Sequence, residues 1–195
     1  LTALAEARAD WDSLENQVAS RQLTAPASTA IHTKLITKLM SVLDQEADYF
    51  GLTLDPETDS YYLIVDALYQ LPGLSEDLGR MRARGAGFLE KKAILPEERV
   101  GMANLLDRAH EHHTAMSNAF LKVGAANPAL KEKLQQIAAE SLLEAEQVMR
   151  LADTQVVKRE QLDYSGVEYV ANFTKAIDMQ FKLLDVVMSD LEKLL

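Results

Sequence analysis

The chain of 195 residues contains no cysteine, and it has only eight glycines, five prolines and one tryptophan. Without cysteine there is no disulfide framework, no thiolate metal site and no cysteine nucleophile. No window of the sequence approaches the run of about 18 uncharged apolar residues that a membrane-spanning helix requires. Because glycine and proline are scarce, few positions force a break in regular structure, which favours long helices.

Basic residues are the minority charge, since 20 lysines and arginines stand against 30 aspartates and glutamates, for a net charge of -10. Nucleic-acid-binding proteins usually present a basic face, so this composition argues against a nucleic-acid partner. It also argues against docking on an anionic membrane surface. The net charge does not exclude a local basic pocket for an anionic ligand. The lack of thiols suits an oxidising compartment, because no free cysteine can form a wrong disulfide there.

Helix-forming residues dominate the chain, chiefly Ala, Leu, Glu, Gln, Lys and Met, which lose little conformational freedom in a helix. Their apolar members recur at helical spacing and predict six helices. These helices are expected at residues 1–22, 27–49, 55 to an end within the segment 82–95, 96 to about 124, 128–157 and 165–195. We therefore predict one all-α domain over residues 1–195, an elongated antiparallel bundle of about six long helices, either single or built as two stacked bundles.

Local patterns predict how the third helix begins and bends. Asp55 and Pro56 suit the N-cap and the first helical position. The apolar stripe of this helix stays in phase across Pro72-Gly73, which predicts a kinked but continuous helix.

Heptad spacing predicts packing seams in the first and last helices. In the first helix Leu4, Trp11 and Val18 are seven residues apart, with Ala7 and Leu14 between them. The seam of the last helix is predicted to consist of Val170, Phe173, Ile177, Phe181, Leu184, Met188, Leu191 and Leu195.

A polar and aromatic stripe follows the third helix through the segment DSYYLIVDALY. Asp59, Tyr62, Asp66 and Tyr69 recur at spacings of three and four residues, which stacks them beside the apolar stripe. Two interpretations stay open at this point. One is a helix–helix seam in which tyrosine hydroxyls find partners, and the other is a ligand cleft with aromatic walls and a few polar anchors.

Arginines are clustered further along the same helix, at Arg80, Arg82 and Arg84. The RARGAG segment is not a phosphate loop, because no strand precedes it and no Lys-Ser/Thr follows. Its residues suit the C-terminal half of a helix, and they are also able to clamp a carboxylate. For a small acidic ligand, the candidate binding residues are therefore Tyr62, Asp66, Tyr69, Arg80 and Arg84.

The segment HEHHT at residues 110–114 suggests a metal site, since His110 and His113 share a helix face. The zinc-protease pattern needs histidine at the fifth position, which is Thr114, and the paired Glu-x-x-His motifs of di-iron bundles are absent. His113 also lies within the apolar stripe of its helix, so a core or interface histidine is the favoured interpretation. No catalytic arrangement stands out, and we predict neither a cofactor nor a bound metal.

The stretch LTLDPETDSYYLIVDALYQLPGLSEDLGRMRARG, residues 52–85, resembles a segment of the extracytoplasmic sensor domains of bacterial transmembrane receptors. The tail YVANFTKAIDMQFKLLDVVMSDLEKLL, residues 169–195, is similar to the closing helix of those domains, and the ANP turn at 126–128 fits as well. Receptors with such domains include methyl-accepting chemotaxis proteins and sensor histidine kinases. The resemblance implies an all-helical sensor domain, lying in the periplasm as part of an inner-membrane protein.

The ends of the chain agree with this expectation, because both terminal helices lack caps, as in a fragment held between two membrane spans. The resemblance implies a non-catalytic fragment that transmits the binding of a small molecule, or of a periplasmic binding protein, by displacement of its terminal helices. A homodimer and a cytoplasmic kinase or other output module are further expectations. The alternatives are a ligand-free helical interaction module and a metal-binding bundle around His110 and His113.

Overall fold

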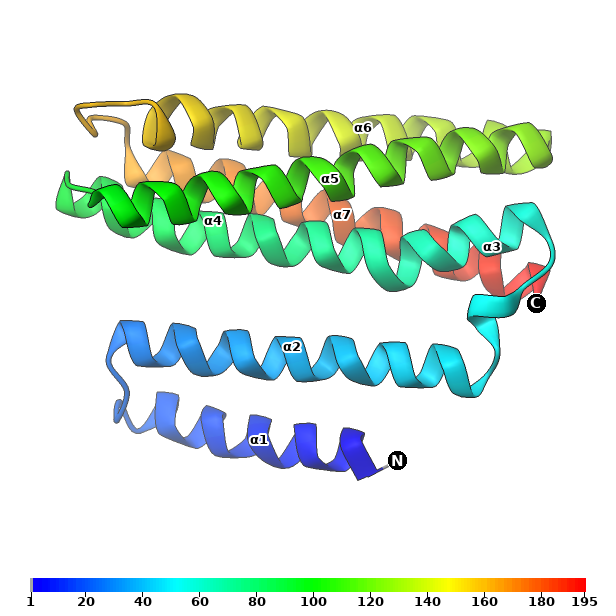
Figure 1. The fold of residues 1–195 in the computed structure, drawn as a ribbon, viewed down its shortest axis with the longest axis horizontal. Coiled ribbons are helices and arrows are strands. Elements are labelled where there is room, and N and C mark those ends of the chain that lie inside the picture. The colour runs from blue at the N-terminus through cyan, green and yellow to red at the C-terminus, as the bar shows by residue number, and fades with distance from the viewer. Residues whose placement is uncertain (1) are drawn as a thin grey trace. The chain divides into compact units, whose positions relative to one another are not determined.

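The computed structural model describes residues 2–195, and within that range it contains helices and no strand (Figure 1). The helices are α1 (Thr2–Ala19), α2 (Ala25–Tyr49), α3 (Thr58–Val65), α4 (Leu71–Lys91), α5 (Pro96–Ala126), α6 (Pro128–Ala152) and α7 (Gly166–Leu194). The predicted all-α class is therefore confirmed. The chain divides into two compact units, residues 1–53 and residues 54–195, and each is described by itself.

The first unit is a helical hairpin in which α1 packs against α2. Thr24 caps α2 by accepting a hydrogen bond from the main-chain N–H of Ala27. Its small core consists of Ala7, Leu14 and Leu35, with Leu23 and Ile31 packed against them. The predicted seam of α1 is thus correct for its inner members, but Leu4, Trp11 and Val18 are 51%, 50% and 45% exposed. A single partner helix covers only one side of α1, which is why the seam is half uncovered within this hairpin.

The second unit is a four-helix bundle. Its first helix is formed by α3, the π-helical turn η2 (Asp66–Gln70) and α4 in succession, and α5, α6 and α7 complete it. Each helix packs against the next along the chain, and α4 packs against α7, which closes an up-down-up-down ring. The largest fully buried side chains of this unit are Leu63, Ile64, Leu71, Leu74, Leu78, Met81, Met102, Met116, Leu134, Tyr169 and Phe173.

The continuous helix predicted across Pro72-Gly73 is confirmed, since residues 58–91 are helical without a break. The turn before the proline is wider than an α-helical one, because the N–H of Leu71 bonds to the carbonyl of Asp66, five residues back. Proline crowds the carbonyl four residues before it and donates no hydrogen bond, and a π-helical turn relieves both problems. Position 73 requires glycine because of its neighbour on α5. A Cβ atom there would lie 2.5 Å from the imidazole Cε1 of His112.

The predicted start of the third helix is wrong by two residues. The helix begins at Thr58, with Glu57 at the N-cap position, and not at Pro56. Asp55 instead closes a turn, in which its carboxylate accepts hydrogen bonds from the N–H of Glu57 (2.8 Å) and the hydroxyl of Ser60 (3.0 Å). Asparagine and aspartate form such turns by bonding to the backbone two residues on, which competes with a helix cap.

The predicted seam of α7 is also partly wrong. The predicted Phe173, Ile177 and Leu191 are buried, but Val170, Phe181 and Met188 are 38%, 53% and 45% exposed. The other inward-facing residues are Tyr169, Ala176, Gln180, Leu183, Val187 and Asp190. Sequence reasoning passed over Gln180 and Asp190 because they are polar. Gln180 exchanges hydrogen bonds with Ser141 inside the bundle. The Oδ1 atom of Asp190 accepts hydrogen bonds from the ammonium groups of Lys133 and Lys193, whereas its buried Oδ2 atom has no partner.

Candidate functional site

Two residues of the polar stripe predicted on the third helix, Tyr62 and Asp59, bond to α5 and to its C-cap residue Asn127. We define the polar seam as Asp59, Tyr62, Asp66 and Gln70 of the α3–η2 segment with His112, Lys122 and Asn127 opposite them. At one end the side-chain amide of Asn127 donates to Asp59 (2.8 Å). At the other end His112 Nδ1 lies 3.0 Å from the Gln70 amide oxygen. Asn127 also caps α6, so the seam ties three helices together.

Tyr62 is held at this seam by Lys122. The Lys122 ammonium donates to the Tyr62 hydroxyl at 2.8 Å and lies 4.3 Å from the centre of the ring. Both contacts are favourable, because an ammonium is attracted to the face of an aromatic ring as well as to its hydroxyl. Tyr69, seven residues on, is half-buried.

Asp66 is the most unusual residue of the seam. Its side chain is fully buried, and neither carboxylate oxygen has a hydrogen-bond partner. Burial without a compensating donor raises the pKa of Asp66 to about 8, so its carboxyl group is largely protonated at neutral pH. The residue also opens the π-helical turn, and such turns frequently occur at functional sites. A buried carboxyl group without a hydrogen-bond partner, at an irregular turn, marks this place as a candidate for functional repacking.

The predicted arginines lie elsewhere along the same helix. Fourteen residues separate Asp66 from Arg80, about 21 Å at helical rise, so one small ion is unable to contact both groups. Arg80 bonds to Glu76 (2.6 Å) and Arg82 to the hydroxyl of Thr174 (2.8 Å). The five candidate residues therefore occupy two stretches of the helix: Tyr62, Asp66 and Tyr69 on α3 and η2, and Arg80 and Arg84 farther along α4. Their role in ligand binding stays a prediction.

His110 and His113 use their rings in hydrogen bonds to main-chain carbonyls. His110 Nδ1 is 2.9 Å from the carbonyl of Leu106, and His113 Nε2 is 3.1 Å from that of Leu142 on α6. Across residues 2–195, no three histidine, aspartate or glutamate side chains gather closely enough to hold a metal ion. The interface histidine favoured from the sequence agrees with the contact of His113, and the geometry gives the metal-binding alternative no support.

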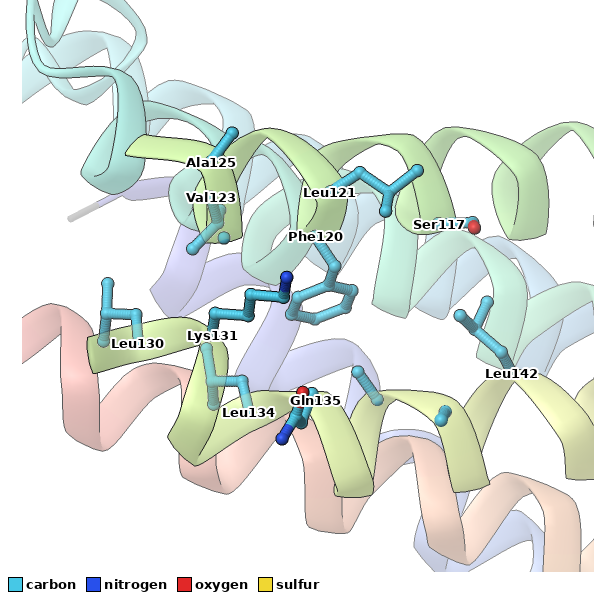
Figure 2. Close-up of a pocket in the computed structure, with 13 residues that line it drawn as sticks. Ser117, Phe120, Leu121, Val123, Ala125, Leu130, Lys131, Leu134, Gln135 and Leu142 are labelled. Atoms are coloured by element: carbon cyan, nitrogen blue, oxygen red, sulfur yellow. The ribbon is translucent and has the colours of Figure 1, made fainter. Parts of the chain in front are cut away.

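Sequence reasoning missed a groove between α5 and α6, which Figure 2 shows in close-up. The groove has a volume of about 290 Å³ and a mostly apolar lining. Phe120 and Leu142 form parts of its wall, and Lys131 is its one charged lining residue. The signal present in the sequence was the apolar Phe120-Leu121 pair, two adjacent residues that cannot both face one core. The groove and the polar seam share the last turns of α5, on its two sides.

The sequence profile of the family described as "Nitrate and nitrite sensing" matches residues 1–193. No protein with curated annotation and no solved structure matches the chain. Within residues 2–195, no helix is both long enough and apolar enough to cross a membrane. The family is one of sensing and not catalytic domains, in agreement with the resemblance at residues 52–85 and 169–195. Because the match spans nearly the whole chain, the protein belongs to the family of nitrate- and nitrite-sensing domains of signal-transduction receptors.

Proposed function

We propose that the chain is the periplasmic sensor domain of an inner-membrane receptor and that nitrate or nitrite is the signal it detects. The observation that carries this proposal is the family match over residues 1–193. The all-helical bundle supports it, because displacement of packed helices is a known way to pass a signal along a receptor.

Arg84 is the residue that we propose for first contact with the anion. Nitrate and nitrite are planar and carry their charge on oxygen atoms, a shape that the parallel N–H groups of a guanidinium match. Among the three clustered arginines, Arg80 and Arg82 already bond to other side chains. Arg84 is exposed on α4, with its Nη1 directed toward Gly101 of α5, where a Cβ atom would come within 3.4 Å. An anion held there would contact α4 and α5 together.

The polar seam is the part that we propose to respond. The helix from Thr58 to Lys91 packs against both α5 and α7, so a shift of α4 against α5 also moves its contact with the last helix. The Asp66 carboxyl group makes no hydrogen bond in its present surroundings, so repacking the η2 turn would break none of its side-chain hydrogen bonds. The anion supplies only the difference between its affinities for the two packings.

The output module and the partners of the receptor are part of the same proposal. A sensor histidine kinase or a chemotaxis transducer is the receptor type that the sequence resemblance suggests. A second copy of the chain is the proposed partner in the membrane, and the half-exposed Phe181 and Met188 of α7 offer it an apolar surface. A periplasmic binding protein is a further candidate partner.

A thermal-shift series tests whether the anion binds. Purified protein is heated with sodium nitrate, nitrite, chloride or sulfate at equal ionic strength. At 100 times its Kd a ligand adds about 2.7 kcal/mol to the free energy of unfolding, which is about 5 to 10 °C for a chain of this length. We expect this shift with nitrate or nitrite only. If neither anion shifts the melting temperature, direct sensing is refuted and the ligand-free interaction module becomes the better account.

Two variants then locate the site. Arg84→Met removes the guanidinium while keeping an unbranched side chain, and it should abolish the shift. Arg150→Met is the matched control, because Arg150 is an exposed arginine on α6 that bonds only to Glu146. An unchanged shift in Arg84→Met would refute the assignment of Arg84 but not the sensing of nitrate.

A further inference from the structure

The groove between α5 and α6 combines an apolar floor with a polar edge. Phe120, Leu134 and Leu142 contribute apolar surface, and Ser117, Lys131 and Gln135 contribute a hydroxyl, an ammonium and an amide (Figure 2). Its volume of about 290 Å³ holds roughly ten water-sized groups, since one water occupies about 30 Å³ in the liquid. This is the small end of the range for ligand sites, which are mostly apolar with a few polar groups that fix orientation.

Lys131 is the feature that gives the groove a chemical preference. It is the only charged residue of the lining, and no acidic side chain pairs with it anywhere in residues 2–195. Its stem lies close over Gly124 of α5, where an added Cβ would come within 3.1 to 3.2 Å of the Lys131 side-chain carbons. Figure 2 shows this side chain running along the groove beside Phe120. In a chain with a net charge of -10, an unpaired ammonium beside apolar surface is a preformed point of attraction for an anion.

We infer that this groove binds a small monocarboxylate with an apolar tail of about five carbons, its carboxylate on Lys131 and its tail against Phe120, Leu134 and Leu142. The tail removes apolar surface of the groove from water, which a bare inorganic anion is unable to do. The single ammonium of Lys131 matches a single negative charge. A dicarboxylate would leave one charge on the apolar floor, which is costly.

The proposed site does not depend on nitrate sensing, because it uses no residue assigned to the nitrate site. It adds a second ligand class to the same bundle. The last turns of α5 carry the groove on one side and Lys122 and Asn127 of the polar seam on the other. An occupant of the groove therefore acts on the helix that contacts Tyr62 and Asp59.

Titration of the purified chain with sodium hexanoate, followed by calorimetry and by the amide resonances of Ser117 and Gly124, tests the site. Acetate has the same head group without the tail, and hexanamide has the same tail without the charge. We expect hexanoate to bind at least tenfold more tightly than either compound and to move both resonances. Equal affinity for hexanoate and hexanamide would overturn the role of Lys131. Binding that leaves both resonances in place would overturn the location.

Three variants complete the test. Lys131→Met keeps the apolar stem and removes the charge, and it should weaken hexanoate binding about tenfold or more. Lys182→Met removes one exposed, unpaired charge on α7 outside the groove and should leave the affinity unchanged. Ala139→Phe fills the groove from an exposed lining position, so that folding is preserved, and it should abolish binding. Undiminished binding by Lys131→Met or by Ala139→Phe contradicts the proposal.

Discussion

The buried carboxyl of Asp66 should make the stability of this protein fall as the pH rises through the neutral range. In the folded chain burial raises the pKa of Asp66 to about 8, from an ordinary value of 3.8. Between these two values the unfolded chain has lost the proton while the folded chain keeps it, so folding takes up a proton. Stability is therefore greatest at low pH for this group, declines as the pH rises toward 8, and levels off above it.

The size of this effect follows from the pH range over which Asp66 is protonated in the folded chain and ionised in the unfolded chain. Each pH unit within the window changes the free energy of unfolding by about 1.4 kcal/mol. From pH 5 to pH 8 the decline is therefore about 4 kcal/mol as an upper bound, because water entry or a shift of the η2 turn would lower it. Even half of that value is a large part of the 5 to 15 kcal/mol by which domains are usually stable.

The variant Asp66→Asn isolates this contribution, since the amide keeps the shape of the protonated carboxyl and never ionises. Urea unfolding at pH 5, 6, 7 and 8 should show a declining free energy for the parent chain and a flatter profile for the variant. The difference between the two should grow with pH in favour of asparagine.

Asp59→Asn is the control for this measurement. The hydrogen bond from Asn127 lowers the pKa of Asp59, so Asp59 stabilises the fold at neutral pH and loses that effect only as the pH falls below about 4. Its variant should keep the parent slope between pH 5 and 8. Parallel profiles for Asp66→Asn and the parent would refute the reasoning, because they would mean that Asp66 ionises in the folded protein at an ordinary pKa.

Two further predictions concern packing in the bundle. A Cβ at Gly85 would lie 2.4 Å from the hydroxyl of buried Tyr169, which donates to the carbonyl of Met81 at 3.2 Å. Because this hydroxyl would have to move, Gly85→Ala should lower the free energy of unfolding, measured with urea, by about 1 to 3 kcal/mol. Gly87→Ala meets nothing within 4 Å and should stabilise the helix by about 0.5 to 1 kcal/mol, and a similar loss in both variants would contradict the role of Tyr169. The buried carboxylate of Asp77 receives two hydrogen bonds from half-exposed Arg108, so Arg108→Met should cost about 1 to 2 kcal/mol, between the values for exposed and for buried pairs. The exposed pair of Arg150 and Glu146 gives the control, Arg150→Met, which should change stability by less than about 0.5 kcal/mol.

Helix positions were accessible from the sequence because apolar spacing and breaker residues are local signals. The unbroken helix through Pro72 was predicted on that basis, as was the start of α5 at Pro96. The start of α3 was misplaced because Asp55 had two local options, a cap or a turn, and only the hydroxyl of Ser60 and the N–H of Glu57 decide between them. The π-helical turn has no pattern of its own apart from the proline that follows it.

The face of α7 that lies inside the bundle was harder to predict than its position. Apolar spacing predicted that Phe181 and Met188 face the core, whereas Gln180 and Asp190 are the buried residues. The hydrogen-bond partners of these two lie on α6 and on α7 itself. Partners on another helix are not visible in a local pattern. The same limit applies to the candidate site: the stripe of Tyr62 and Asp66 was visible, but Lys122 opposite it and the groove beside Lys131 depend on how three helices assemble.

Calorimetric titration of sodium nitrate and sodium nitrite into the purified chain, against chloride at the same ionic strength, tests the central claim most directly. The account predicts saturable binding of nitrate, nitrite or both, near one ion per chain, weakened at least tenfold by Arg84→Met. It is contradicted if the folded protein takes up neither anion more tightly than chloride.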